Sequence, residues 1–176
     1  KKRHPKILSS GANNTVIALS ETEVGKLFVG DTRSDIGSEA EKMKFANSIN
    51  NLIVKFIRLD VNEALNSDML VMERLYPLNF RAYEVGKREL WLAIFEDELQ
   101  ALHRAGFVHC DLCRPSDMPG LSYDNIFLTP TGLRLIDVGI SALQSQVGDR
   151  LFYRFVEQEL QEIEEFKTFL LVDKVE

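Results

Sequence analysis

Residues 102–141 decide the fold, and they read LHRAGFVHCDLCRPSDMPGLSYDNIFLTPTGLRLIDVGIS. Two short apolar runs lie in this stretch, at residues 126–128 and 133–136. The Pro-Thr-Gly sequence at residues 130–132 stands between them, and these residue types form turns. The pattern predicts a β-hairpin with the Pro-Thr-Gly sequence at its tip.

Polar side chains lie in the loops around this hairpin. Asp111 precedes it, Asp124 and Asn125 stand directly before its first strand, and Asp137 follows its second strand. A hairpin returns to its starting point, so these groups can converge on one place. Two carboxylates and a carboxamide suit Mg²⁺, which takes few protein oxygens and completes its shell with phosphates and water. The alternative is a hairpin with acidic ends and no metal.

The composition is that of one compact globular domain. The chain has 176 residues, of which 45% are apolar and 27% are charged. No apolar run approaches the length that crosses a bilayer. The net charge of −6 argues against broad attraction to nucleic acid, so the basic residues 1–6 are expected to be a solvated end. We expect a monomer that binds neither a membrane nor a nucleic acid.

The two cysteines, Cys110 and Cys113, have the C-x-x-C spacing of some redox and zinc sites. A redox pair requires a strand-to-helix setting, and a structural zinc requires four ligands. His103 and His109 could be added to such a set, but the chain has no second C-x-x-C. Free thiols in a reducing compartment are the better interpretation, which predicts a cytoplasmic protein.

The N-terminal part is predicted to contain three short strands, at residues 6–8, 15–19 and 24–28. The small residues between the first two strands, SSGANN at residues 9–14, allow the backbone to approach a ligand closely. Lys26 lies between apolar neighbours in the third run. Its side chain therefore faces either solvent at a sheet edge or a binding site.

A helix and two further strands are predicted next. Helix signals begin between residues 35 and 38, and residues 39–46 form a short amphipathic helix. Apolar runs at residues 52–59 and 69–72 predict two strands separated by a polar turn. Pro77 ends the second of these, because proline has no amide hydrogen for a strand ladder.

The C-terminal part is predicted to be helical. Residues 88–104 are amphipathic, and Gly106 is a natural end for that helix. Its expected buried face is Leu90, Trp91, Leu92, Ile94, Phe95, Leu99 and Leu102. Residues 141–148 are predicted to be a polar loop, and residues 150–171 one or two helices. The expected core residues of the latter are Phe152, Phe155, Leu160, Ile163, Phe166 and Leu170.

The stretch quoted first resembles the catalytic segment of protein kinases. Asp111 lies in HCDL, which corresponds to H-R-D-L, and Asn125 corresponds to the asparagine of the catalytic loop. Asp137 begins DVG, which corresponds to D-F-G and lies twelve positions after Asn125. Asp111 and Asn125 are fourteen positions apart, whereas the family pattern has five. The nine extra residues predict that residues 113–123 form an insertion that loops out.

The N-terminal strands resemble the nucleotide-binding part of the same family. The positions that match the glycine-rich loop are Ser9, Gly11, Asn14 and Val16, and only the middle glycine of that pattern is kept. Lys26 matches the lysine that contacts the α- and β-phosphates. The resemblance implies a glutamate partner for it on the following helix, and Glu41 is expected in this role with Glu39 as the alternative.

The resemblance also implies roles for the remaining site residues. Asn125 and Asp137 would hold Mg²⁺, and Asp111 would accept the hydroxyl proton of the substrate. Arg114 resembles the lysine after H-R-D-L, displaced by one residue, and would contact the γ-phosphate. The residues assigned to the adenine are Val16, Val24, Met72, Glu73 and Leu75, and Phe127 is expected to bind the same nucleotide. His109 is expected to be a packed core histidine that bonds to backbone.

The implied fold is α+β and bilobal. Residues 1–75 would form an N-lobe with a five-stranded antiparallel sheet and one helix, and residues 76–176 a reduced helical C-lobe. No A-P-E sequence follows Gly139, so the chain resembles minimal kinases of the kind found among bacterial effectors. Cys110 replaces the arginine of H-R-D, which implies a kinase that is not switched by activation-loop phosphorylation. An effector would work in a host cytosol.

The implied activity is transfer of phosphate from ATP, with Mg²⁺, to a serine or threonine hydroxyl of a protein. A kinase of small molecules, similar to the aminoglycoside or choline kinases, is one alternative, although the chain lacks the helices that form their substrate pocket. A nucleotide-binding pseudokinase is the other, suggested by the departures at Ser9, Asn14 and Cys110. The insertion lies near the reacting groups, so we expect it to engage the protein substrate.

Overall fold

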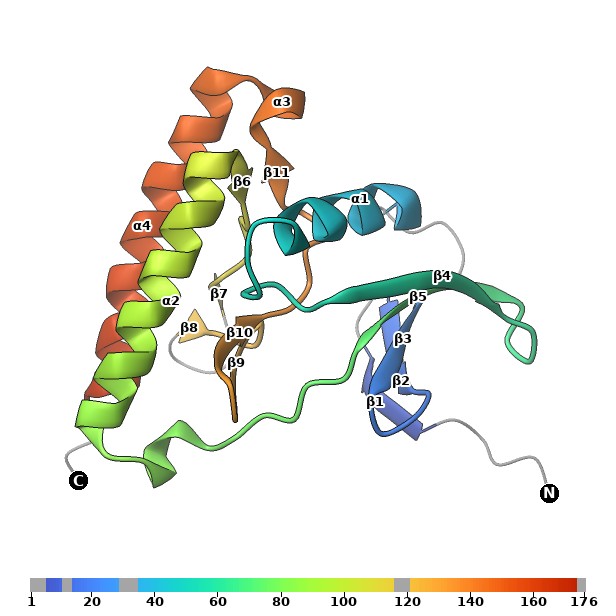
Figure 1. The fold of residues 1–176 in the computed structure, drawn as a ribbon, viewed down its shortest axis with the longest axis horizontal. Coiled ribbons are helices and arrows are strands. Elements are labelled where there is room, and N and C mark those ends of the chain that lie inside the picture. Colours follow the sequence, from blue (N-terminus) through green and yellow to red (C-terminus); the bar gives the residue numbers. More distant parts are fainter. Residues whose placement is uncertain (1–5, 11–13, 29–34, 116–120, 174–176) are drawn as a thin grey trace.

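The structure is a computed structural model that describes residues 6–10, 14–28, 35–115 and 121–173 of the chain. A five-stranded antiparallel sheet and one helix form the N-terminal part, and the C-terminal part is mainly helical (Figure 1). The predicted α+β class and the predicted sheet with its single helix are confirmed.

The N-terminal sheet has the strand order β1-β2-β3-β5-β4. Its strands are β1 (Lys6–Ser10), β2 (Asn14–Ala18), β3 (Glu23–Phe28), β4 (Phe56–Asn62) and β5 (Ser67–Glu73). Four of the five lie close to where the sequence predicts them. Of the predicted glycine-rich loop, Ser9 and Asn14 belong to β1 and β2, and Gly11 lies outside the described residues.

The fourth strand begins later than predicted, at Phe56 instead of at residue 52. Leu52, Ile53 and Val54 are fully buried and run beside the C-terminal part of the molecule. The Val54 N–H donates to the Leu135 carbonyl, and the Leu135 N–H donates to the Leu52 carbonyl, both at 2.8 Å. A continuous apolar run indicates burial but does not identify the partner. Here the partner is the C-terminal part, so this segment joins the two parts.

The helix α1 (Ile36–Asn47) packs against β4 and β5. It begins after Asp35, whose carboxylate accepts the Gly37 N–H at 2.9 Å and so satisfies a donor of the first turn. Its buried residues are Glu39, Ala40, Met43 and Ala46. The three- and four-residue spacings place them on one face. A carboxylate on that face requires a partner.

The helix α2 (Val85–Ala105) follows a short 3-10 helix, η1 (Phe80–Ala82), and ends at Gly106 as predicted. Gly106 has a φ of 100°, which favours glycine at a helix end. The buried residues of α2 are Arg88, Leu92, Phe95, Leu99, Leu102 and His103. The predicted buried face was too wide, because Leu90 and Ile94 are 61% and 49% exposed. Neither residue is on the stripe that faces α4 and β10.

Short strand pairs hold the loops of the C-terminal part. They are β6 (Phe107–Val108) with β11 (Ala142–Leu143), β7 (Arg114–Pro115) with β8 (Leu121–Ser122), and β9 (Ile126–Thr129) with β10 (Gly132–Leu135). The hairpin of β9 and β10 is the predicted one. The predicted polar loop at residues 141–148 instead contains β11 and the one-turn helix α3 (Gln144–Val147), because Ala142 and Leu143 are buried against β6.

The helix α4 (Asp149–Leu171) is a single helix beside α2 (Figure 1). Its buried residues are Phe152, Glu159, Ile163, Phe166 and Leu170. The prediction of Leu160 as a core residue was wrong, since Leu160 is exposed and Glu159 takes the buried position. Glu159 follows Phe152 by seven residues, which keeps it on the same face, whereas Leu160 is rotated by about 100°.

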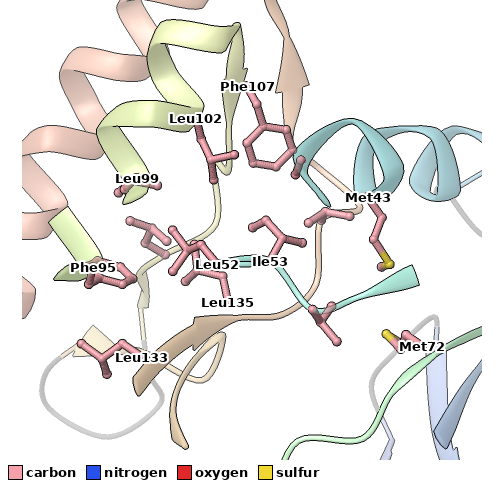
Figure 2. Packing of buried hydrophobic residues seen from close by; sticks show 14 of the residues in the cluster. Met43, Leu52, Ile53, Met72, Phe95, Leu99, Leu102, Phe107, Leu133 and Leu135 are labelled. Carbon is pink, nitrogen blue, oxygen red and sulfur yellow. The ribbon is translucent and has the colours of Figure 1, made fainter. Parts of the chain in front are cut away.

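One buried apolar cluster joins the two parts of the molecule (Figure 2). Among its members are Met43 of α1, Leu52 and Ile53 of the connecting segment, Phe95, Leu99 and Leu102 of α2, and Leu135 of β10. Truncating one such side chain typically costs about 2–5 kcal/mol of stability. The cluster therefore holds the sheet, α1 and the C-terminal loops in one arrangement. None of the helices within the described ranges is long and apolar enough to cross a membrane.

Candidate active site

Lys26 lies at the centre of the candidate site. It is buried in the middle of β3, and its Nζ lies 2.8 Å from Glu39 Oε1 and 3.4 Å from Asp137 Oδ1. Glu39 comes from α1, and Asp137 follows β10. Three elements that are distant in sequence therefore place one positive and two negative charges together. Lys26 is buried and ion-paired, so its side chain does not face solvent at a sheet edge.

The glutamate beside Lys26 is Glu39, so the prediction of Glu41 was wrong. Glu41 is exposed and lies 3.6 Å from Lys44, one turn further along α1. Two positions along a helix correspond to a rotation of about 200°, so Glu39 and Glu41 cannot face the same side. The buried positions Ala40 and Met43 show that the Glu39 side faces the core.

Burial and the Lys26 charge act in opposite directions on the two carboxyl groups. For Glu39, burial is the larger effect and raises the pKa, although Lys26 opposes it. For Asp137, burial also acts to raise the pKa, but the Lys26 charge and the N–H of Gly139, 3.3 Å away, together lower it. Asp137 is therefore ionised at neutral pH, as a metal ligand must be.

His109 connects the loop of Asp111 to the segment before Asp137. It is fully buried, and its Nε2 lies 2.8 Å from the Ile136 carbonyl oxygen. Because a carbonyl only accepts, Nε2 carries the hydrogen, and Nδ1 accepts the Asp111 N–H at 3.1 Å. The prediction of a packed histidine that bonds to backbone is confirmed.

Asn125 connects the same two loops from the other side. It is buried, and its side-chain Nδ2 donates to the Asp111 backbone carbonyl at 2.9 Å. The backbone carbonyl of Asn125 accepts the Ile136 N–H at 3.0 Å. The loops that carry Asp111, Asn125 and Asp137 are thus hydrogen-bonded to one another. The convergence inferred from the hairpin is present in the structure.

The backbone of the site is strained. Cys110 has a φ of 70° and Asp137 a φ of 59°, and Asn66 is the one other non-glycine residue with positive φ in the described ranges. Such residues cost about 1–3 kcal/mol each and concentrate at functional sites. Cys110 directly precedes the candidate residue Asp111, and Asp137 is itself a candidate residue.

Glu159 holds the backbone of the Asp111 loop, and the sequence did not predict this role. Its Oε1 accepts the Cys110 N–H at 2.9 Å, and its Oε2 accepts the His109 N–H at 3.3 Å. Oε2 also lies 2.6 Å from His103 Nε2. The seven-residue interval from Phe152 could have revealed that Glu159 belongs to the buried face of α4.

The residues assigned to adenine lie in the sheet and beside it. Val24 and Met72 are paired across β3 and β5, both are buried, and Val16 and Leu75 are partly buried against the same cluster. Phe127, which is partly buried, lies on β9 opposite Arg134. The Glu73 N–H donates to the Lys55 carbonyl at 3.0 Å. That bond uses neither the Glu73 carbonyl nor the Leu75 N–H, which the resemblance assigns to adenine.

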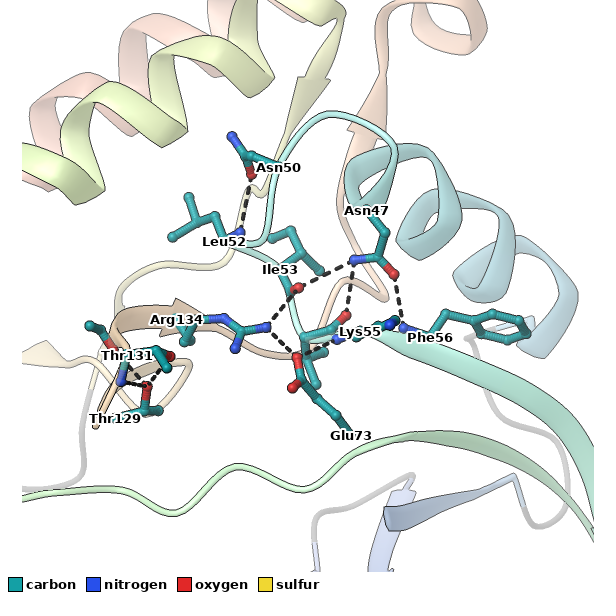
Figure 3. Close-up of polar contacts among 12 residues, drawn as sticks. Asn47, Asn50, Leu52, Ile53, Lys55, Phe56, Glu73, Thr129, Thr131 and Arg134 are labelled. Atoms are coloured by element: carbon teal, nitrogen blue, oxygen red, sulfur yellow. Dashed lines mark hydrogen bonds and ion pairs between the residues drawn. The ribbon is translucent and has the colours of Figure 1, made fainter. Parts of the chain in front are cut away.

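The Glu73 side chain joins the end of β5 to β10 (Figure 3). Its Oε1 forms an ion pair with Arg134 and accepts the Lys55 N–H at 2.9 Å. Asn47 also contributes, because its Nδ2 donates to the Ile53 carbonyl at 3.2 Å. Arg134 was not among the predicted site residues, since a charge on a hairpin strand is most often solvated.

Arg114 lies in β7, at the base of the insertion, where it pairs with Ser122 of β8. Its predicted contact with the γ-phosphate concerns a side chain outside what the structure describes. Tyr123, directly after β8, packs its ring 5.3 Å from that of Phe166 and 4.8 Å from that of Phe169. The end of the insertion is therefore attached to α4.

The donor set of the site fits Mg²⁺. Within the described residues no group of three or more His, Cys, Asp or Glu side chains is placed to hold a metal ion. Asn125 and Asp137 would supply two oxygen ligands, which matches the preference of Mg²⁺ for few protein ligands. Cys110 and Cys113 are free thiols, and burial together with the charge of Glu159 raises the pKa of Cys110 to about 12. A thiol of this kind is a poor metal ligand.

The structure is similar to that of a kinase from Cydia pomonella granulovirus, PK-1, with a TM-score of 0.56 and 15% sequence identity. The match covers 78% of this chain and 53% of the viral protein, so this chain spans about half the length of that kinase. No protein family and no curated protein matches the sequence. The chain has a protein kinase-like fold.

Proposed function

We propose that the chain is an ATP- and Mg²⁺-dependent phosphotransferase, and that it acts as a minimal protein kinase on serine or threonine hydroxyls. One observation carries the proposal. Lys26 Nζ lies 2.8 Å from Glu39 and 3.4 Å from Asp137, beside the hydrogen-bonded loops of Asp111 and Asn125. All five charged or polar groups that phosphoryl transfer uses in kinases are thus present on one fold.

Each of these residues has a defined task in the proposed reaction. ATP would supply the phosphoryl group, and Mg²⁺, when bound, would supply positive charge beside its phosphates. Lys26, oriented by Glu39, binds the α- and β-phosphates. Asn125 Oδ1 and the ionised Asp137 would hold the metal. Asp111, fixed by His109 and Asn125, accepts the proton of the attacking hydroxyl.

A protein hydroxyl is the proposed acceptor because the segment that carries Asp111, Asn125 and Asp137 resembles the catalytic segment of protein kinases.

Heat denaturation tests the nucleotide site. A ligand that binds only the folded protein stabilises it by RT ln(1 + [L]/Kd), which is about 2.7 kcal/mol at 100 times Kd. Mg-ATP should therefore raise Tm, and Asp137→Ala should lose most of the magnesium-dependent part of the rise. Asp97→Ala, at an exposed position on α2, is the matched control. Equal stabilisation of wild type and Asp137→Ala would show that Asp137 is not a metal ligand.

Transfer of radiolabelled phosphate from ATP to panels of proteins and small molecules tests the reaction. Labelling of serine or threonine in a protein is the expected result. Labelling confined to a small-molecule acceptor would replace the protein kinase assignment with a small-molecule kinase. Binding of Mg-ATP without transfer to any acceptor would identify a pseudokinase.

A further inference from the structure

Among the described residues, no strand pairs with the outer edge of β4. In the sheet order β1-β2-β3-β5-β4 it is an outer strand, and its described pairing is with β5. Ile57, Leu59 and Val61 are 36%, 48% and 54% exposed. The hairpin of β4 and β5 extends beyond α1 (Figure 1). An outer strand with exposed apolar side chains is a ready template for a further strand.

The usual protections of an outer strand are weak in β4. Its bulge lies at the beginning, between Phe56 and Arg58, and the pairing with β5 is regular from Arg58 to Asn62. The Val61 N–H donates to its neighbour's carboxylate, Asp60 Oδ1, at 2.8 Å. A local bond of this kind is what an edge amide makes when it has no strand to accept its hydrogen. The carbonyl of an added strand could therefore replace Asp60 as the acceptor of the Val61 N–H.

The sequence of β4 is complementary to itself. Around Leu59, the order is Ile57, Arg58, Leu59, Asp60, Val61. When two copies run antiparallel about Leu59, each Arg58 stands opposite an Asp60, and each Ile57 stands opposite a Val61. Opposite charges and apolar pairs across neighbouring strands are both stabilising. We propose that β4 pairs with β4 of a second copy of this chain, which would form a two-fold dimer with a continuous sheet of both copies.

The charges of β4 are exposed and can change partner. Arg58 lies 3.3 Å from Asp60 and 3.1 Å from Glu23 of its own chain. In the dimer, Arg58 keeps Glu23 and gains Asp60 of the partner subunit. An interface of one strand pair is smaller than the standard protein interface of about 1,600 Å². The dimer should therefore be weak and should depend on concentration, which departs from the monomer expected from the sequence.

Sedimentation equilibrium over a range of concentrations tests the dimer. The wild-type mass should rise from 20.1 kDa towards twice that value. Arg58→Asp and Asp60→Arg each place like charges opposite one another and should weaken association by about tenfold. The double variant restores opposite charges and should recover association to about the wild-type level. A wild type that remains at 20.1 kDa, or a double variant no better than the single variants, would overturn the proposal.

Oxidative cross-linking tests the register without changing any charge. In the proposed register, Leu59 is the one position of β4 that stands opposite the same residue, Leu59 of the partner subunit. Leu59→Cys should therefore form a disulfide-linked dimer in high yield. Val61→Cys is the matched control, because its counterpart is Ile57 of the partner subunit. Wild type measures the background from Cys110 and Cys113. Cross-linking of Val61→Cys as strong as that of Leu59→Cys would overturn the proposed register, and no cross-linking of Leu59→Cys above the wild-type background would overturn the pairing.

Discussion

Two glutamates on α1, two positions apart, have opposite environments. Glu39 is buried beside Lys26, and Glu41 is exposed beside Lys44. Burial makes the charge of Glu39 costly, and its Oε2 has no hydrogen-bond partner in the described structure. The Lys26 ammonium offsets part of this cost. A group retained at such a cost is consistent with a role in function more than in stability.

Substitution of the two glutamates should separate these environments. Glu39→Gln removes the charge that orients Lys26, so we expect transfer of phosphate from ATP to fall by about 10- to 100-fold, the size of effect that misplacement of a catalytic group produces. Glu41→Gln should leave the rate unchanged. The measurement is kcat/KM for ATP, with Tm as the check on folding. Equal loss in both variants would contradict the assignment of Glu39.

The lowered pKa of Asp137 predicts a pH dependence of stability. Burial alone would raise this pKa, but Lys26 and the Gly139 N–H lower it below the ordinary value of 3.8. The unfolded chain therefore binds the proton at a higher pH than the folded chain does. The resulting stability is present above the unfolded pKa and is lost as pH falls through the folded pKa.

Urea denaturation of wild type and Asp137→Asn between pH 7 and about pH 3 measures this contribution. As the pH falls, the unfolding free energy of wild type should decrease more than that of Asp137→Asn. The raised pKa of Glu39 acts with the opposite sign, but Glu39 is present in both proteins. Parallel pH profiles would show that Lys26 does not stabilise the Asp137 carboxylate.

At the scale of elements, α4 supports the loop that carries Asp111. A single turn of this helix places Glu159 against two backbone amides and His103. Without Glu159, the buried His109 N–H and the partly buried Cys110 N–H would lose these acceptors. The helix thereby fixes the backbone directly before Asp111.

Replacement of Glu159 should destabilise the protein strongly. Glu159→Leu leaves the two amides and His103 without their acceptor, and each such buried group costs about 1–3 kcal/mol. We expect a total loss of roughly 3–5 kcal/mol for the three groups together. Glu157→Leu, at an exposed position on α4, should change stability by less than about 0.5 kcal/mol. Urea denaturation provides the measurement, and similar losses for both variants would argue against the bonds of Glu159.

At the scale of the whole molecule, the end of the insertion and Asn125 are held by different contacts. Tyr123 attaches the end of the insertion to α4 through Phe166 and Phe169. Asn125 is held by the Asp111 carbonyl and the Ile136 N–H. A change within residues 116–120 should therefore leave Asn125 in place.

Replacing residues 116–120 with a glycine linker of the same length tests the role of the insertion. The rise of Tm with Mg-ATP should be unchanged, and phosphorylation of the protein substrate should fall by about tenfold or more if the insertion engages it. Autophosphorylation, or hydrolysis of ATP, serves as the control for the reacting groups. Loss of the Mg-ATP effect would mean that the insertion holds Asn125, and unchanged phosphorylation would place the substrate elsewhere.

The sequence by itself determined the order of the elements and the convergence of the site. Turn residues at the tip of β9–β10, the glycine that ends α2 and the spacing from Asn125 to Asp137 are local signals, and each predicted its feature. Local geometry decides where a hairpin turns and where a helix ends. For this reason the amino-acid sequence alone is enough to predict that the loops of Asp111, Asn125 and Asp137 lie together.

Only the tertiary structure decided which face of each element is buried. The elements that pack against α1 and α4 bury Glu39 and Glu159 and leave Glu41 and Leu160 exposed. Leu90 stays exposed because it lies outside the buried stripe of α2 that the described residues cover. Hydrophobic periodicity gives the width of an apolar face only approximately, and it ignores a buried carboxylate altogether. The partner of a buried charge lies far away in sequence, and only the folded chain brings the two together.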